Sequence, residues 1–288
     1  MNSAIETMLS KYNIQNNEDR QNAIKEILQE ITLAGLSRGG FFEKAAFYGG
    51  TCLRIFYGLD RFSEDLDFAL INRDGTFDIS KYFPYVKEEF STYGINADID
   101  VKNKDFTTDV QSAFIKTNTL ILMMTFFPTY EDSKNFPDQQ KIQIKFEIDT
   151  DNPSGGIIRS KFQMLPAPYE VKIFDESTLF AGKIHAILCR NYANNVKGRD
   201  YYDYLFYIAR GFSFNLKYLE NKLRNTGFYK ENEPLTLEKI KGMLKQKFEL
   251  TNYTMAKNDV MPFIKSKRSI DIWCKELFES TLVSLKAS

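Results

Sequence analysis

Two short stretches in the first quarter of the chain combine paired glycines with paired carboxylates. Gly49 and Gly50 are followed by Thr51, and Asp65 and Asp67 come soon afterwards. Glycine has no Cβ, so this pair allows a sharp turn and a close approach of the backbone to a phosphate. Side chains two positions apart on a strand share one face, which would bring Asp65 and Asp67 together. Adjacent carboxylates repel each other without a cation, so the pattern predicts a divalent metal that also binds nucleotide phosphates.

These stretches resemble a known signature. The segment Tyr48–Arg54 (YGGTCLR), followed by Arg61–Phe68 (RFSEDLDF), is similar to the first signature of the AbiEii/AbiGii toxin family of nucleotidyltransferases. The segment Lys183–Arg190, followed by KGRDYYD at 197–203, is similar to the second. The two occur in the family's order, and the family's catalytic core and helical half would account for nearly the whole chain.

The resemblance implies an enzyme that transfers a nucleotide from a nucleoside triphosphate (NTP) to an acceptor with the help of Mg²⁺. It also implies the toxin of a toxin–antitoxin or abortive-infection (phage-defence) pair in a bacterial cytoplasm, with a cognate antitoxin as partner. RNA, particularly a tRNA 3′ end, is the acceptor that the family connection favours. Two alternatives stay open: nucleotidylation of a protein or small molecule, and a catalytically degenerate module that only binds nucleotide. Intact Asp65 and Asp67 argue against the degenerate module.

The expected site combines the acidic strand with residues that the resemblance singles out. We expect catalytic roles for six side chains: Asp65, Asp67, Glu147, Lys183, Asp200 and Asp203. Asp65, Asp67 and Glu147 would hold the metal. Nucleotide contacts are expected from six other residues: Gly49, Gly50, Thr51, Ser63, Arg190 and Arg199.

The third carboxylate is predicted on a strand at 141–149, where apolar and polar residues alternate. Lys145, Glu147 and Asp149 share the polar face of that strand. The family resemblance points to Glu147, whereas the alternation alone allows Asp149 as well.

Two predicted helices carry the second group of site residues. Lys183 and Arg190 are seven positions apart and therefore share a face, and the resemblance makes Lys183 the residue that neutralises the triphosphate. Asp200 and Asp203, three positions apart, also share a face. They would orient Lys183 or Arg199, or contact the base or the ribose.

Four nearby polar residues have other expected roles. Thr51 would cap the helix that follows the glycines. Arg54 is expected in a structural ion pair, and Arg61 would pair either with phosphate or with Glu64. His185, the single histidine, is expected to be structural.

An α/β (α+β) fold is needed to position these residues. Apolar periodicity predicts helices at 19–36 and 78–93, and strands at 45–48, 65–71, 95–101, 114–126, 141–149 and 170–174. Helices dominate after Asp175, so we divide the chain in two. Residues 1–174 would form a nucleotidyltransferase catalytic domain, and residues 175–288 a helical domain that contributes the Lys and Asp motifs and binds the acceptor.

Composition agrees with a globular protein of a reducing compartment. Of the 288 residues 43% are hydrophobic, which is enough for a core, and three distant cysteines form no metal-binding or disulfide pattern. The chain opens with no basic-then-apolar leader, and no apolar run is long enough to span a membrane. We therefore expect a cytoplasmic protein without membrane contact.

The zero net charge hides an asymmetry. Residues 1–174 contain 19 Lys+Arg and 25 Asp+Glu, whereas residues 175–288 contain 19 and 13. An acidic half that holds a metal and a basic half that holds a polyanion would explain this distribution. The expected contacts with RNA phosphates are four lysines on a predicted helix: Lys239, Lys241, Lys245 and Lys247.

Overall fold

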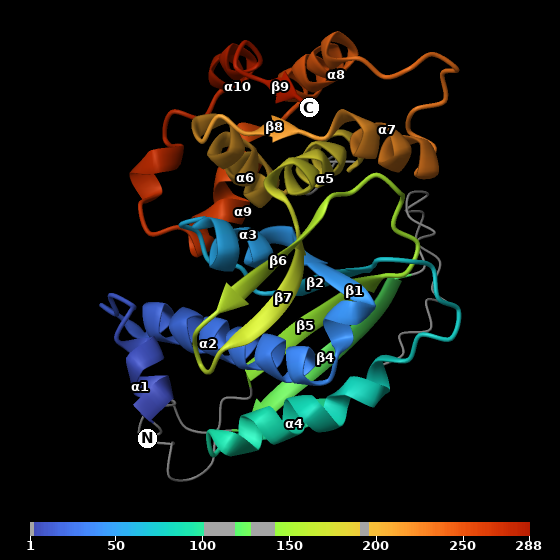
Figure 1. The fold of residues 1–288 in the computed structure, drawn as a ribbon. Coiled ribbons are helices and arrows are strands. Elements are labelled where there is room, and N and C mark those ends of the chain that lie inside the picture. The colour runs from blue at the N-terminus through green and yellow to red at the C-terminus, as the bar shows by residue number, and fades with distance from the viewer. Residues whose placement is uncertain (1–2, 101–118, 128–141, 191–195) are drawn as a thin grey trace, which may run out of the picture.

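The computed structural model describes residues 3–100, 119–127, 142–190 and 196–288 (Figure 1). A mixed sheet of seven strands has the order β3-β4-β5-β2-β1-β7-β6. Its strands are β1 (Ala45–Tyr48), β2 (Leu66–Leu70), β3 (Asn96–Asp100), β4 (Thr119–Phe127), β5 (Ile142–Asp149), β6 (Ile158–Gln163) and β7 (Tyr169–Phe174). β2 pairs with β5, and β1 with β7, in parallel; the other neighbours are antiparallel. The predicted α/β class is confirmed.

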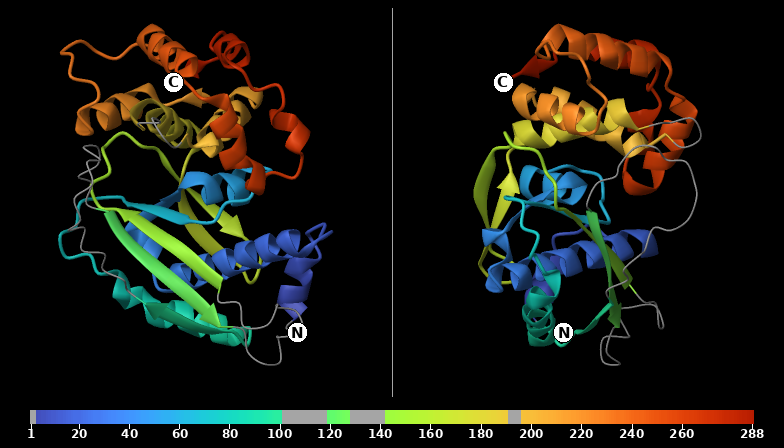
Figure 2. Two further views of the ribbon diagram at one scale, coloured as in Figure 1. Left: turned by 180° about the vertical axis from the view of Figure 1, so that it is seen from behind. Right: turned by 90° about the vertical axis from the view of Figure 1, so that its right-hand side faces the viewer.

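Helices cover the sheet and continue beyond it. The first half contains α1 (Ser3–Leu9), α2 (Asn17–Arg38), α3 (Gly49–Tyr57) and α4 (Phe83–Thr92). The second half contains α5 (Glu176–Cys189), α6 (Gly198–Ala209), α7 (Leu216–Asn225), α8 (Leu237–Glu249), α9 (Tyr253–Val260), α10 (Lys275–Thr281) and the short strands β8 (Ser213–Phe214) and β9 (Lys286–Ala287). Figures 1 and 2 show α2 and α4 lying along the sheet, while α5 to α10 form a helical layer on the far side of α3. Within the described ranges, no helix has the length and apolar character needed to cross a lipid bilayer.

Alternation along the central strands separates a core face from a polar face. Phe68 of β2 stacks on Phe146 of β5 with ring centroids 4.5 Å apart, and Phe41 meets Phe68 edge-on at 5.0 Å. All three rings are fully buried. Because neighbouring side chains on a strand point in opposite directions, Asp67 and Glu147 lie on the other face of the sheet.

The helical layer has its own aromatic core. Tyr201 and Tyr204 of α6 both lie against Phe248 of α8 and Phe278 of α10, and the centroid distances run from 5.3 to 6.3 Å. Burying these large rings fixes the rotation of α6. The adjacent face of α6, which carries Asp200 and Asp203, is thereby held in one orientation.

Most predicted elements are present, with shifts at their ends. The helix predicted at 78–93 begins as a 3₁₀ turn, Ile79–Tyr82, and continues as α4, where Pro84 occupies the first turn and its missing N–H breaks no helical hydrogen bond. The strand predicted at 114–126 forms β4 from Thr119, and its first five residues lie outside the described ranges. Strand β6 was not predicted, because the half-exposed edge segment IRSKFQ lacks a clear apolar alternation. Asp175 marks the change from strands to helices, since its side chain accepts a hydrogen bond from Thr178 N at 2.9 Å and caps α5.

Glu30 of α2 gives a testable dependence of stability on pH. The residue is 8% exposed, and burial, reinforced by the neighbouring Glu26, raises its pKa to about 8. A folded-state pKa above the ordinary value of 4.5 means that the folded protein holds this proton more tightly than the unfolded chain. Its contribution to stability should therefore be lost as the pH rises from 4.5 through about 8. Glu30→Gln should flatten that decline in thermal unfolding measured across this range, and an unchanged pH dependence would contradict the burial of the acid.

Candidate active site

The polar face of the central strands brings three acidic residues together. Asp67 of β2 lies opposite Glu147 of the parallel strand β5 and opposite Tyr48 of the antiparallel strand β1. Asp65 directly precedes β2 and is close enough to Glu147 for their charges to repel. The structure thus gathers Asp65, Asp67 and Glu147 on a face that neighbouring strands hold in register.

The glycine pair lies against the segment Ser63–Asp67, which we call the acidic segment. Gly49 has a φ of +82°, and a Cβ placed on it would lie 2.0 Å from Asp67 Oδ2. A Cβ on Gly50 would lie 2.7 Å from Arg61 Nη2 and 2.8 Å from Ser63 Oγ. The packing of the acidic segment therefore requires both glycines, in addition to the phosphate contacts expected of them.

Thr51 does not cap the following helix. α3 begins at Gly49 with Tyr48 as its N-cap, and Thr51 lies in the first turn, fully buried. Its hydroxyl donates to the Asp65 carbonyl oxygen at 2.6 Å. The predicted cap is wrong because the helix already begins at Gly49, and the Thr51 side chain instead holds the Asp65 backbone in place.

The acidic face carries strongly interacting charges. Burial, followed by repulsion from Glu147 and Asp65, raises the pKa of Asp67 to about 7. Burial also raises the pKa of Asp65, although Lys145 opposes the shift. Lys145 forms an ion pair with Glu147, so an ammonium group already lies beside the carboxylates.

The chemistry of these donors suits a hard divalent ion, because carboxylate oxygens are the ligands that Mg²⁺ prefers. In the part of the chain that the structure describes, no three acidic, histidine or cysteine side chains converge on a point where an ion could be held. Asp65 and Asp67 would supply the first ligands. Glu147 would become the third ligand if the ion replaced Lys145 as the partner of its carboxylate.

Lys183 of α5 is held between two aspartates of α6. Its Nζ lies 2.8 Å from Asp200 Oδ1 and 2.8 Å from Asp203 Oδ2. Arg190, at the end of α5, reaches Asp200 Oδ2 with its Nη1 at 2.5 Å. The structure therefore unites these four expected site residues in one network. Of the roles left open for the two aspartates, the geometry favours orienting Lys183.

Arg61 joins this network to the acidic segment. Its Nε and Nη2 donate to the two carboxylate oxygens of Asp203 at 2.6 and 2.7 Å, and both side chains are buried. The expected alternatives for Arg61 are wrong: Glu64 pairs with Lys25 at 2.9 Å, and Asp203 occupies the guanidinium fork that phosphate would need. Arg61 is thus a buried link between the two halves of the chain.

The pKa values in this network follow from its pairing. Burial alone would raise the pKa of Asp200 and Asp203, but Lys183 and the neighbouring arginines outweigh burial and hold both pKa values below the usual range. The two aspartates likewise raise the pKa of Lys183 against the effect of burial. Lys183 is also close enough to Asp67 to oppose the rise in its pKa. A permanent ammonium therefore lies beside the acidic face, where it can neutralise phosphate.

The register of β5 separates the two candidates for the third carboxylate. Glu147 lies opposite Asp67, whereas Asp149 lies opposite Ala69, one step further from the acidic segment. Asp149 Oδ2 is 3.6 Å from Lys222 Nζ of α7, which gives it a separate ion pair. We therefore retain Glu147 as the third carboxylate.

Other expected residues have mainly structural partners. Arg199 Nε lies 3.6 Å from Asp259 Oδ2, and its guanidinium lies 4.3 Å from the Phe263 ring centroid. Arg54 forms the predicted structural ion pair, with Glu26. Arg199 thus contacts the last turn of α9 and the turn that follows it, and its ion-pair partner is Asp259.

The four lysines expected to contact RNA all lie on α8. Lys239 pairs with Glu231, Lys241 pairs with Glu238, and Lys247 donates to backbone carbonyl oxygens at the end of α5. Three of the four thus have intramolecular partners, so α8 presents less unbalanced positive charge than its sequence suggests.

Two contacts of the site were missed in the sequence. The opposite charges of Lys145 and Glu147, two positions apart on one strand face, were a visible signal for the first. No local pattern marks Arg61 as the partner of Asp203, because the two residues are 142 positions apart.

Lys183 and its neighbour His185 should respond very differently to substitution. Lys183→Met removes the ammonium that lies beside the acidic face, and we expect transfer to slow about 100- to 1,000-fold. His185 hydrogen-bonds Thr226 at 3.1 Å, and burial lowers its pKa to about 3, so it stays neutral and His185→Gln should change the rate little. Steady-state transfer, with thermal unfolding as the control for folding, measures both. A larger loss for His185→Gln at equal stability would show that the helix faces are assigned wrongly.

Comparison with known proteins identifies the family of this chain. The family model described as "Nucleotidyl transferase AbiEii toxin, Type IV TA system" matches residues 31–273, which include every expected site residue. The search of curated proteins found no match.

Two crystal structures of Helicobacter pylori proteins show a distant similarity to this chain. JHP933 is 18% identical, with 92% of this chain and 88% of that chain covered and a TM-score of 0.46. A second protein, described only as a candidate nucleotidyltransferase, is 19% identical, with 93% and 99% covered and a TM-score of 0.45. Because the family model spans most of the sequence, the chain belongs to the AbiEii family of nucleotidyl transferase toxins of type IV toxin–antitoxin systems.

Proposed function

We propose that this nucleotidyltransferase toxin transfers a nucleotide from an NTP to RNA, specifically to a tRNA 3′ end, in a Mg²⁺-dependent reaction. The observation that carries the proposal is that Asp65, Glu147 and the ammonium of Lys183 all lie close enough to Asp67 to shift its pKa. Residues 1–174 would form the catalytic domain, and residues 175–288 the helical domain that completes it and binds the acceptor. The basic balance of the second half and the family connection support an RNA acceptor.

In the proposed reaction, a hydroxyl oxygen of the acceptor bonds to the α-phosphorus of the NTP as the bond to the β-phosphate oxygen breaks, and pyrophosphate leaves. The hydroxyl proton passes to the Glu147 carboxylate. Asp65 and Asp67 would hold Mg²⁺, which when bound offsets the negative charge of the phosphate oxygens. Lys183, fixed by its two aspartates, neutralises the departing pyrophosphate.

We assign the remaining phosphate contacts to the start of α3 and its surroundings. Gly49 and Gly50 lie at the helix N-terminus, where backbone N–H groups favour anions. Ser63 Oγ lies beside Gly50. Arg190 and Arg199 add positive charge at the border of the site.

The test is to incubate the protein with each α-³²P-labelled ribonucleoside triphosphate, MgCl₂ and either total tRNA or total cell protein. We expect label in the tRNA, lost when EDTA is added and recovered at the 3′-terminal nucleotide after nuclease digestion. Label in protein alone would support protein nucleotidylation instead. Nucleotide binding without transfer to any acceptor would support the degenerate module.

A further inference from the structure

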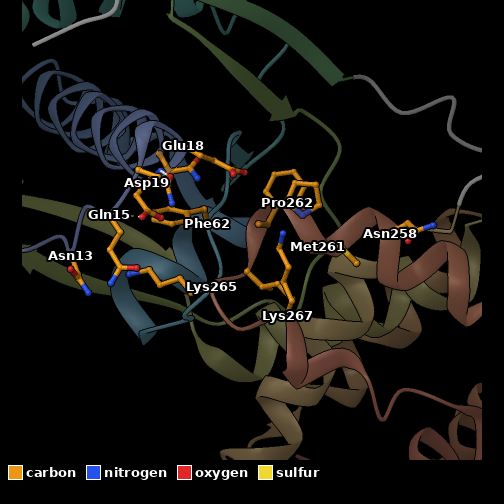
Figure 3. A pocket seen from close by; sticks show the side chains of 14 residues that line it. Asn13, Gln15, Glu18, Asp19, Phe62, Asn258, Met261, Pro262, Lys265 and Lys267 are labelled. Atoms are coloured by element: carbon orange, nitrogen blue, oxygen red, sulfur yellow. Dashed lines mark hydrogen bonds between the residues drawn. The ribbon is translucent and has the colours of Figure 1, made fainter.

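A cavity lies between the start of α2 and the segment that follows α9 (Figure 3). Its volume is about 610 Å³, within the range of roughly 300–1,000 Å³ typical of ligand pockets. Carboxamide side chains, including Asn13, Gln15 and Asn22, line the side formed by the first half of the chain. Apolar side chains, including Met261 and Pro262, line the other side.

The cavity adjoins the active site. Its wall residue Phe62 directly precedes the acidic segment, and Phe62 N donates to the Phe263 carbonyl oxygen at 2.8 Å. The Phe263 ring, also in the wall, lies against Arg199, whose charge reaches Asp65. Phe62 and the contact between Phe263 and Arg199 therefore connect the cavity to the segment that carries Asp65, although none of the assigned carboxylates lines the cavity.

The charged groups of the cavity are segregated. Lys265 and Lys267 are exposed on the side formed by the second half, and Lys265 Nζ lies 5.7 Å from the Phe62 ring centroid. Glu18 and Asp19 lie on the opposite side, at the start of α2. A phosphate would be attracted to the lysines and repelled by the acids. The acids can instead accept hydrogen bonds from base amino groups.

The uncharged side chains that line the cavity also suit a nucleic-acid ligand. Carboxamides donate and accept at once, which matches the edges of unpaired bases. An apolar wall of proline, methionine and aromatic side chains gives a base a surface to pack on. A ligand with alternating phosphates and bases satisfies all three parts of the lining, whereas a purely anionic or purely apolar ligand satisfies one.

We propose that this cavity binds the single-stranded end of the nucleic-acid acceptor, with a phosphate beside Lys265 and Lys267 and a base beside the carboxamides. This inference rests on the proposed transfer to RNA and locates the acceptor. The acceptor would then bind at the junction of the two halves and not at α8, where three of the four lysines have intramolecular partners.

The test compares two double variants. Lys265→Gln/Lys267→Gln removes the lysines of the cavity, and Lys230→Gln/Lys286→Gln removes two exposed lysines elsewhere as a matched control. Transfer to a single-stranded RNA oligonucleotide and to tRNA is measured at several salt concentrations. For the cavity variant we expect the acceptor KM to rise about tenfold and its log–log salt slope to shrink by about 0.7 per lost phosphate contact, with an unchanged KM for NTP. The control should match wild type.

The outcomes separate this inference from the proposed function. Equal acceptor KM values and equal salt slopes for the two double variants, while wild type labels RNA, would overturn the cavity assignment alone. Wild type that labels protein and no RNA would overturn the proposed acceptor and the cavity assignment together. Thermal unfolding of both variants confirms that the exposed substitutions leave the fold intact.

Discussion

Asp67→Asn should abolish nucleotidyl transfer without weakening the fold. The amide keeps the shape of the side chain but removes a negative charge that we assign to metal binding. Losing that charge stabilisation should raise the barrier by several kcal/mol, a rate loss on the order of a thousand-fold or more. Stability should be kept or increased, because burial, Glu147 and Asp65 all oppose the Asp67 carboxylate and raise its pKa to about 7. Transfer assays, growth arrest on expression and thermal unfolding near pH 8 measure the three effects.

Glu64→Gln is the matched control for this substitution. The substitution also removes one negative charge from the same segment, but the Glu64 side chain is 43% exposed and pairs with Lys25. Its activity should stay close to that of wild type. A folded Asp67→Asn protein with full activity would remove Asp67 from the site.

Arg61→Leu should cause a large loss of stability. It leaves the fully buried Asp203 carboxylate with only Lys183, which Asp200 already shares. Breaking a buried ion pair by removing one partner costs about 3–5 kcal/mol. Arg61→Lys should retain more stability than Arg61→Leu but less than wild type, because an ammonium cannot donate two parallel hydrogen bonds to one carboxylate as a guanidinium does. Urea unfolding at neutral pH measures the series.

A double substitution distinguishes the contribution of the ion pair to stability from its contribution to activity. Arg61→Leu/Asp203→Leu removes both buried charges. The loss of unfolding free energy of this double variant should therefore be smaller than the sum of the losses of the two single variants. Activity should stay low, because Lys183 loses one of the two carboxylates that position it. Stability losses that simply add, or a single variant as stable as wild type, would show that the pair does not link the two halves.

The acidic strand was predictable because local rules place its residues. Alternation with Leu66 and Phe68 required Asp65 and Asp67 to share a face, and the same rule placed Glu147 on the polar face of β5. Helical spacing also predicted that Lys183 and Arg190 lie on one side; Arg190 follows α5 as its C-cap with extended backbone, and both side chains reach Asp200.

The features that could not be predicted from the sequence depend on tertiary contacts, which local spacing rules do not describe. Gly49 lies against Asp67 with no room for a Cβ, and Thr51, inside the first turn of α3, bonds the Asp65 carbonyl oxygen, which is 14 positions away in the sequence. The partner of Arg61 depends on the docking of α6, which aromatic packing with α8 and α10 determines. Spacing along the chain describes neighbours on one element and says nothing about which elements meet.

The link between Arg61 and Asp203 also governs when the enzyme becomes competent during its synthesis. A ribosome reaches Asp203 142 residues after Arg61, which at about 5–20 residues per second takes roughly 7 to 28 s. For most of that interval the nascent chain holds Asp65 and Asp67 but lacks Lys183 and the two aspartates that complete the site. Translation thus imposes a delay on toxicity. We expect a product that ends at a premature stop codon between the halves to carry the carboxylates but to be inactive.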